Sequence, residues 1–148
     1  AMTKATPPSI RPENPASVPG PNPHPERPTD SPHRGVIVTG ENGADGRKAF
    51  YIHIEAKPGK ENEVVQMLRD IYDCVLDELA TGPWFGIRYS STTFGIFEAF
   101  PNIAGRDAHV AGGGGDIFRD NARMNELLAY PAHVYRVDVL LNKAAVGI

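Results

Sequence analysis

Two short apolar runs in the middle of the chain are separated by only two residues, and this spacing is the strongest constraint on the fold. The runs are WFGIRYS at 84–90 and TFGIFEAF at 93–100. Their aromatic and branched residues are typical of strands, and so short a connection can join them only as antiparallel neighbours in a tight hairpin. The centre of the folded region is therefore predicted to be a β-hairpin.

The segment before the hairpin has the pattern of a strand followed by a helix. In KAFYIHIEAK, at 48–57, side-chain character alternates with the period of a strand. After the Pro-Gly pair at 58–59, apolar residues recur at helical spacing over about 60–80. The Gly-Pro pair at 82–83 is expected to end this helix.

The segment after the hairpin repeats the order of helix and strand. A helical stretch is predicted at about 103–111, followed by four glycines at 112–115 and a second helix at about 116–128. The last run, at 132–143, is apolar almost throughout, which is typical of a strand buried on both faces. The glycines are expected to form a mobile lid at the mouth of a pocket, or simply to precede a helix capped by Asp116.

The resulting order is β-α-β-β-α-β, which predicts an α+β protein of the ferredoxin-like, split βαβ type. Two helices can cover only one face of the sheet. The strands nevertheless carry large apolar side chains on both faces, for example Phe94 and Ile96 on one and Phe97 on the other. We therefore expect a homodimer in which two sheets pack face to face.

The N-terminal region differs in composition from the rest. Ten of the 14 prolines lie in residues 1–34, which contain only three large apolar residues. Such a segment cannot bury enough apolar surface to fold alone. We divide the chain into a proline-rich arm, 1–47, with a short accessory strand near 35–39, and a domain, 48–148. Residues 1–40 are expected to lie along the partner subunit or a neighbouring copy, with 36–38 added to a sheet edge.

Charge and cysteine content exclude several classes of function. The formal net charge of −3 and the absence of a basic cluster argue against nucleic acid or a membrane as partner. No apolar run approaches the ~20 residues of a membrane span. The one cysteine, Cys74, excludes an intramolecular disulfide, so we expect a cytoplasmic protein. No phosphate-binding glycine motif and no metal-ligand spacing is present, so neither a metal nor another cofactor is expected.

Three longer stretches resemble the antibiotic biosynthesis monooxygenase family, and within it a quinol-monooxygenase-like branch. They are HIEAKPGKENEV, WFGIR with STTFGIFEAFPNIAGRDAHVAG, and ELLAYPAHVYRVDVLLNK, and together they cover about 48–143. The resemblance implies a dimeric α+β barrel with a pocket between sheet and helices in each subunit. It also implies an oxidoreductase that inserts an oxygen atom from O2 into a phenolic or quinol-type aromatic without flavin, haem or metal.

The leading hypothesis is therefore a cofactor-independent monooxygenase acting on a small aromatic quinol or polyketide-like phenol. Such chemistry needs a base, a donor or positive group for the developing anion, and a dry aromatic pocket. Two alternatives remain open: a non-catalytic module that binds a small ligand or a partner on the same scaffold, and an isomerase or decarboxylase with a similar substrate.

Two residues are candidates for the chemistry itself. His109, in AGRDAHVAG, can act as general base or substrate hydrogen-bond donor, or it can be a half-buried histidine that only packs or caps. Arg88 lies in an otherwise apolar strand. It either holds a substrate oxygen or pairs with Glu98, Glu55 or Asp138 across the sheet.

Five further residues are candidates for binding an aromatic substrate. Four are aromatic side chains that can wall a pocket, although aromatics at strand spacing also build ordinary cores. The fifth is a histidine that faces either the pocket or the dimer interior, because alternation alone does not identify the face. The five residues are Trp84, Phe118, Tyr51, Phe97 and His53.

Overall fold

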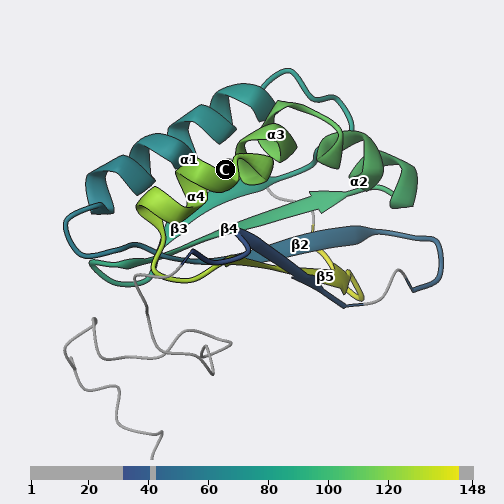
Figure 1. The fold of residues 1–148 in the computed structure, drawn as a ribbon. Coiled ribbons are helices and arrows are strands. Elements are labelled where there is room, and N and C mark those ends of the chain that lie inside the picture. The colour runs from purple at the N-terminus through teal and green to yellow at the C-terminus, as the bar shows by residue number, and fades with distance from the viewer. Residues whose placement is uncertain (1–31, 41–42, 144–148) are drawn as a thin grey trace, which may run out of the picture.

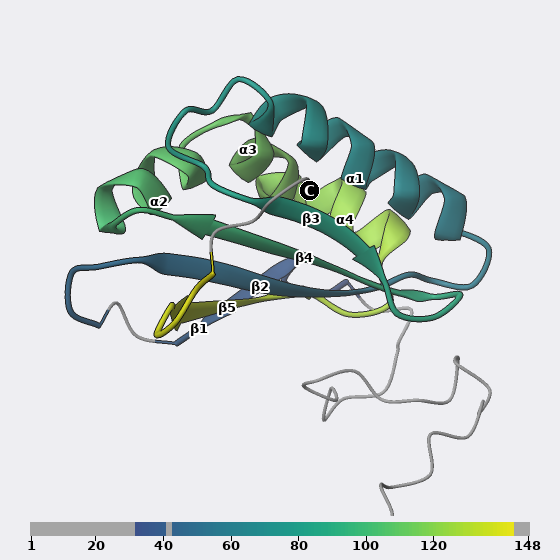
Figure 2. The same ribbon diagram turned by 180° about the vertical axis from the view of Figure 1, so that it is seen from behind.

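The structure is a computed structural model, and it describes residues 32–40 and 43–143. Within these ranges a five-stranded sheet forms one layer and four helices form the other (Figure 1). The helices all lie on one side of the sheet, as the view from behind also shows (Figure 2). The elements are β1 (Val36–Thr39), β2 (Lys48–Glu55), α1 (Glu61–Val75), β3 (Trp84–Arg88), β4 (Thr93–Phe100), α2 (Ile103–Val110), α3 (Gly113–Arg119), α4 (Asn121–Leu127) and β5 (Ala132–Asp138).

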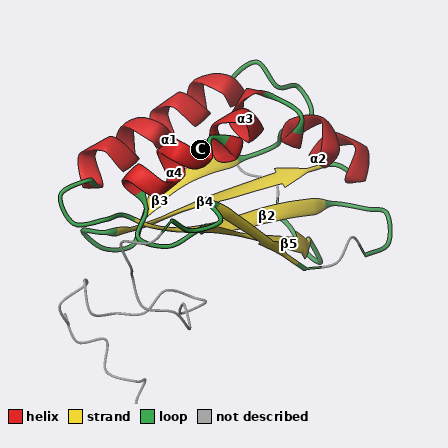
Figure 3. Cartoon of the chain, in the orientation of Figure 1, coloured by secondary structure: helices red, strands yellow, loops and turns green. Residues whose placement is uncertain are grey.

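The predicted α+β, ferredoxin-like fold is confirmed. The strand order is β1-β5-β2-β4-β3, and the pairs β5–β2, β2–β4 and β4–β3 are antiparallel. The central hairpin consists of β3 and β4, as their spacing predicts. Figure 3 shows how helices and strands separate into the two layers. Within the described ranges, none of the helices combines the length and apolar character needed to cross a membrane.

Strand β1 lies on the sheet of its own subunit, which corrects the expectation that residues 32–40 lie along a partner. It pairs in parallel with β5, with Val36 opposite Ala132. The chain just before β1 is anchored to α4, because the backbone N–H of His33 donates to Asn125 Oδ1 at 2.6 Å and Asn125 Nδ2 donates to the His33 carbonyl at 3.0 Å. The rest of the predicted arm, 1–31, lies outside the described residues, and the domain boundary at 47 stays a prediction.

Two predicted elements are longer than the observed ones. Helix α1 ends at Val75, five residues early, and the chain turns there through a backbone bond from Glu78 N–H to the Val75 carbonyl. Strand β5 ends at Asp138, because its pairing with β2 ends where Lys48 begins that strand. The apolar residues beyond these ends, such as Leu79 and Leu140, are exposed.

The glycine run is part of a helix, so the prediction of a lid is wrong. Residues 113–115 begin α3, and the predicted helix 116–128 is in fact two helices that meet at Asp120, whose side chain caps α4. A Cβ atom on Gly115 would lie 1.9 Å from the Val110 carbonyl oxygen, and one on Gly113 would lie 2.9 Å from Cys74 Sγ. The glycines therefore allow α3 to pack closely against α2 and α1.

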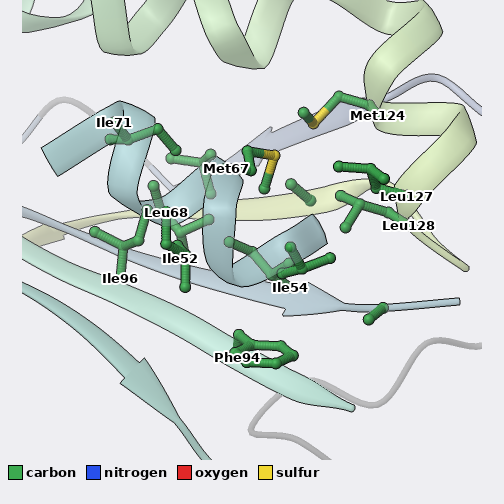
Figure 4. Close-up of a cluster of buried hydrophobic side chains, with 14 of the residues drawn as sticks. Ile52, Ile54, Met67, Leu68, Ile71, Phe94, Ile96, Met124, Leu127 and Leu128 are labelled. Atoms are coloured by element: carbon green, nitrogen blue, oxygen red, sulfur yellow. The ribbon is translucent and has the colours of Figure 1, made fainter. Parts of the chain in front are cut away.

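The core lies between the sheet and helices α1 and α4. Ile71, Met67 and Leu68 project from α1 toward the inner face of the sheet, where they meet Ile52 and Ile96 (Figure 4). Leu127 and Leu128, at the end of α4, close the same cluster beside Ile54. Burial of these side chains supplies the main driving force for folding.

The other face of the sheet has no helix over it in the described residues. The strand register places Tyr51, Phe97, Phe85 and Tyr135 in one row on this outer face, because directly opposed residues of antiparallel strands point to the same side. Phe85 is 36% exposed, and Ile87 on the same face is 41% exposed. The outer face is thus an aromatic and apolar surface that the subunit itself leaves partly open.

A matched pair of leucines tests this description of the core. Leu128 is fully buried and Leu79 is fully exposed. We expect Leu128→Ala to lower the free energy of unfolding by about 2–5 kcal/mol, since it removes buried methyl groups and leaves a cavity. Leu79→Ala should change it by less than ~0.5 kcal/mol. Urea unfolding of both variants measures the difference, and equal effects would contradict the assigned core.

Candidate functional site

A cavity of about 410 Å³ lies between the sheet and helices α2 and α3. Its floor is the inner face of β1, β5, β2 and β4, and its roof is formed by the helices. The wall combines apolar side chains with several charged ones. The lining residues are Val36, Val38, Phe50, Ile52, Val134, Val110, Gly115 and Phe118, together with Glu98, Arg106, Asp107, His109, Arg119 and Arg136.

His109, in the last turn of α2, is held between two carboxylates. Its Nδ1 lies 2.5 Å from Glu78 Oε1, and its Nε2 lies 3.0 Å from Glu98 Oε1. The imidazole side chain is 8% exposed, and that of Glu98 is 2% exposed. Because α1 ends early, the turn that follows it brings Glu78 to this place, and Thr81 in the same turn donates to Glu78 Oε1 at 3.3 Å.

The two carboxylates favour the protonated form of His109. Burial alone lowers the pKa of the imidazole, but the hydrogen bond and charge of Glu98, followed by those of Glu78, outweigh it and raise the pKa above its ordinary value. Both ring nitrogens then act as donors. The site therefore favours the imidazolium form of His109, in which neither nitrogen is available as an acceptor.

Glu98 presents the second oxygen of its carboxylate without a hydrogen-bond partner. Oε1 accepts from His109, whereas Oε2 is buried and has no partner among the described residues. Glu98 lies on the inner face of β4 in register with Phe50 of β2, at the wall of the cavity. A carboxylate that is held through one oxygen can accept a proton or hydrogen bond through the other.

Sequence reasoning considered Glu98 only as a partner for Arg88. The signal that identifies it is its place in the alternation of β4, where positions 94, 96, 98 and 100 share one face. The other three positions on that face are Phe94, Ile96 and Phe100, all buried. A single acidic residue in such a row must be paired or functional, because an unpaired charge is costly to bury.

Three guanidinium groups also belong to the cavity wall. Arg106 lies on α2 one turn before His109 and is 3% exposed, and its Nε lies 3.8 Å from Asp107 Oδ1. Arg119 donates to the Val110 carbonyl at 2.8 Å and to Asp116 at 2.6 Å. Arg136 of β5 donates to the Gly40 carbonyl at 2.5 Å, which ties β5 to the end of β1.

Arg88 does not reach this cavity. Its Nε and Nη2 donate to the carbonyls of Ser90 and Ser91, each at 3.0 Å, and its guanidinium lies over the Phe94 ring at 4.8 Å from the centroid. Among the described residues Arg88 therefore holds the hairpin turn and makes no ion pair with Glu98, Glu55 or Asp138, and it lies outside the cavity lining.

The predicted aromatic residues divide between the two faces of the sheet. Phe118 lines the cavity, as predicted for a binding residue. Trp84 faces the helices but packs against the core and against Tyr72, at 5.7 Å between ring centroids, outside the cavity. Tyr51, His53 and Phe97 lie on the outer face, away from the cavity. Alternation predicts that these three share a face but cannot show that the helices cover the opposite one.

No metal site is formed by the part of the chain that the structure describes, since nowhere in it do three His, Cys, Asp or Glu side chains gather as ligands. The polar groups of the cavity are instead arranged as a hydrogen-bonded row, Glu78, His109 and Glu98, with one oxygen left open.

Comparison with solved structures identifies a relative of this chain. No protein-family model matches the chain, and no curated protein matches it. Among solved structures, the NE2512 protein of unknown function from Nitrosomonas europaea is 32% identical, with a TM-score of 0.62, over 69% of this chain and 97% of that one. The chain belongs to the same family as this protein.

Other solved structures establish the wider fold. A protein from Nitrosomonas europaea described as a candidate antibiotic biosynthesis monooxygenase is 14% identical, with a TM-score of 0.59, over 68% of this chain and 97% of that one. A similarly described protein from Caulobacter crescentus is 18% identical, with a TM-score of 0.55, over 66% of this chain and 92% of that one. The chain thus has the predicted fold of the antibiotic biosynthesis monooxygenases, and the quinol-monooxygenase branch stays a prediction.

The raised pKa of His109 gives a pH test of the site. A group whose pKa is raised on folding contributes stability that is complete below its unfolded pKa, about 6.5, and is lost as the pH rises through the folded pKa. We therefore expect His109→Gln to lower the free energy of unfolding more at pH 6 than at pH 9, as measured by urea unfolding.

His133→Gln is the matched control for this test. Burial lowers the pKa of His133, so its contribution must change in the opposite direction, with a larger loss at pH 9 than at pH 6. The same pH trend in both variants, or no trend in His109→Gln, would contradict an imidazolium held by two carboxylates.

Proposed function

We propose that this chain is a cofactor-independent monooxygenase that inserts an oxygen atom from O2 into a small aromatic quinol or phenol. The observation that carries the proposal is Glu98, a buried carboxylate that lines a largely apolar cavity and whose Oε2 has no hydrogen-bond partner among the described residues. A buried carboxylate beside a ligand cavity is suited to remove a phenolic proton, and the resulting phenolate is electron-rich enough to react with O2 itself.

Glu98 is the proposed proton acceptor, and His109 positions it. His109 was the first candidate for the base, but each of its ring nitrogens already lies against a carboxylate oxygen, of Glu78 on one side and of Glu98 on the other. The hydrogen bond to Oε1 fixes the carboxylate and leaves Oε2 for the substrate. His109 and Glu78 are thus positioning residues in this proposal.

The reaction balances without a further reductant. A quinol and O2 give a hydroxyquinone and water: one ring C–H becomes C–OH, both quinol O–H groups become carbonyls, and the second oxygen atom leaves as water. The substrate supplies all four electrons. Glu98 takes a proton from the quinol hydroxyl, which allows the ring carbon to bond to O2, and returns that proton to the oxygen atom that leaves when the O–O bond breaks.

The cavity suits such a substrate in shape and polarity. Phe50, Ile52 and Phe118 provide apolar and aromatic walls around the open carboxylate oxygen. Phe50 also lies beside the imidazole, with 6.3 Å between the ring centroids. Excluding water here strengthens every charge interaction in the site and protects a reactive anion. The single cysteine, Cys74, fits a cytoplasmic location.

The outer face of the sheet supports the proposal of a homodimer. Phe85 and Ile87 are 36% and 41% exposed, and Tyr51 and Phe97 beside them are half-buried. A row of aromatic and branched side chains on a flat sheet is costly to leave in water, and a second copy of the same face is self-complementary.

Replacing Glu98 tests the proposed chemistry. Glu98→Gln keeps the size of the side chain but cannot take up a proton. We expect kcat to fall by roughly 10²–10⁴-fold, the usual contribution of a general base. The measurement is the rate of O2 uptake with a panel of hydroquinones and anthrones.

Glu126→Gln is the control, because this glutamate is exposed on α4 and does not line the cavity. It should keep the wild-type rate. No O2 uptake by the wild-type protein with any substrate of the panel would refute the proposed function. Conversion of the same compounds without O2 would instead favour an isomerase or decarboxylase.

Charge placed on the outer face tests the dimer. We expect Ile87→Asp to convert the protein to monomers in sedimentation velocity, because an unpaired carboxylate would be buried at the interface. Leu79→Asp places the same charge at an exposed site in the turn after α1 and should leave the dimer intact. A wild-type protein that is monomeric at all concentrations would overturn the proposal.

A further inference from the structure

The lining of the cavity has a closed end and an open end. Glu98 and Ile52 are each 2% exposed and Phe50 is 6% exposed, so the end at which Glu98 lies is shut off from solvent. Val38 on β1 and Val110 at the end of α2 line the same cavity but are 51% and 41% exposed. The cavity therefore meets solvent between β1 and α2, and these two valines form the apolar part of its mouth.

A single apolar row of the floor joins the two ends. Ile52 of β2 is directly opposite Val134 of β5, which is in turn opposite Val38 of β1. All three line the cavity, and their exposure rises along the row from 2% through 7% to 51%. Phe50, the preceding inner-face residue of β2, is opposite Glu98. The row thus starts beside the carboxylate and ends at the mouth.

The distance between the two ends is larger than one aromatic ring. Glu98 lies on β4 and Val38 on β1, with β2 and β5 between them in the sheet. Three strand spacings make about 14 Å. A one-ring quinol held at Glu98 leaves Val134 and Val38 in contact with water, whereas each methylene group buried over them raises the affinity about fourfold. The length and polarity of the row therefore favour a ligand with an apolar extension.

We propose that the ligand of this cavity is an elongated hydroxyaromatic compound with an apolar substituent at the end remote from its hydroxyl group. The hydroxyl group lies at Glu98, and the substituent lies over Val134 and leaves the cavity between Val38 and Val110, which select it. The inference rests on the proposed function for the role of Glu98 and goes beyond it in naming the substrate class and two specificity-determining residues.

Isothermal titration without O2 tests this with 4-alkylphenols, from 4-methylphenol to 4-octylphenol, as probes. They carry one hydroxyl group and, opposite to it, an unbranched chain of variable length. We expect the affinity to rise about fourfold for each added methylene group until the chain reaches the mouth, and to level off for longer chains, whose ends lie in water. An affinity that does not depend on chain length, one that rises undiminished through the whole series, or binding of none of the phenols would overturn the inference.

A charge placed at the mouth locates the bound chain. Val38→Asp and Val110→Asp should weaken the binding of 4-hexylphenol by at least about fivefold, because the chain then passes a hydrated carboxylate. Both variants should bind 4-methylphenol, whose methyl group stays inside the cavity, within about twofold of the wild-type affinity, because the substitutions are distant from the Glu98 end. This second measurement separates an effect on the mouth from a loss of the fold.

Leu76→Asp is the matched control. Leu76, just past the end of α1, is an apolar residue that is 61% exposed and does not line the cavity. The substitution should leave the affinities of the whole series unchanged. Wild-type affinity for 4-hexylphenol in either mouth variant, or the same loss in Leu76→Asp, would overturn the assignment of the mouth and with it the inference.

The outcome is separable from that of the proposed function, because the titration involves no O2 and no turnover. Chain-length dependence in a protein that never consumes O2 would refute the oxygenation and leave the ligand class standing. O2 uptake with one-ring quinols and no dependence of phenol binding on chain length would do the reverse.

Discussion

The Glu78–His109–Glu98 contact is the interaction on which the rest of the site depends. It joins three separate segments: the turn after α1, the end of α2 and the inner face of β4. Breaking a buried pair by removing one partner costs several kcal/mol, since it leaves a charge without its counter-charge. The row therefore fixes α2 over the sheet, keeps a cavity between them and holds one oxygen of Glu98 open. The stability of this region and the arrangement of the cavity wall rely on the same two hydrogen bonds.

The sequence predicts the layers of this fold better than the ends of its elements. Period-two alternation in 48–57 and the two-residue connection at 91–92 are local properties, and both are confirmed as β2 and the central hairpin. Where α1 and β5 end is not local. The predicted helix ends one turn early, and the turn that follows places Glu78 beside His109. Strand β5 ends where its pairing with β2 ends. The need for glycine at the start of α3 is also not a local property. It arises because α3 packs closely against Val110 and Cys74, which lie on other helices.

The sequence predicts the residue types of the site but not which side chains meet there. His109 is identified by its residue type, but its role depends on whether its nitrogens are free, and that depends on residues 31 and 11 positions earlier in the chain. Glu98 was within reach of sequence reasoning, as the one charged position on the inner face of β4. Tyr51, His53 and Phe97 could be assigned to a shared face but not to the uncovered one. The side of a sheet that helices cover is decided by connections between elements, which alternation does not record.

Strand β1 links the N-terminal part of the described chain to the cavity. Val36 and Val38 form part of its wall, and the carbonyl of Gly40, just past β1, accepts a hydrogen bond from Arg136. The strand has few contacts of its own and is held by β5 on one side and by the His33–Asn125 hydrogen bonds at its start. A sheet without β1 would expose the edge of β5 and remove the part of the cavity wall that Val36 and Val38 form. The strand that precedes the ferredoxin-like unit thus forms part of the wall of the cavity.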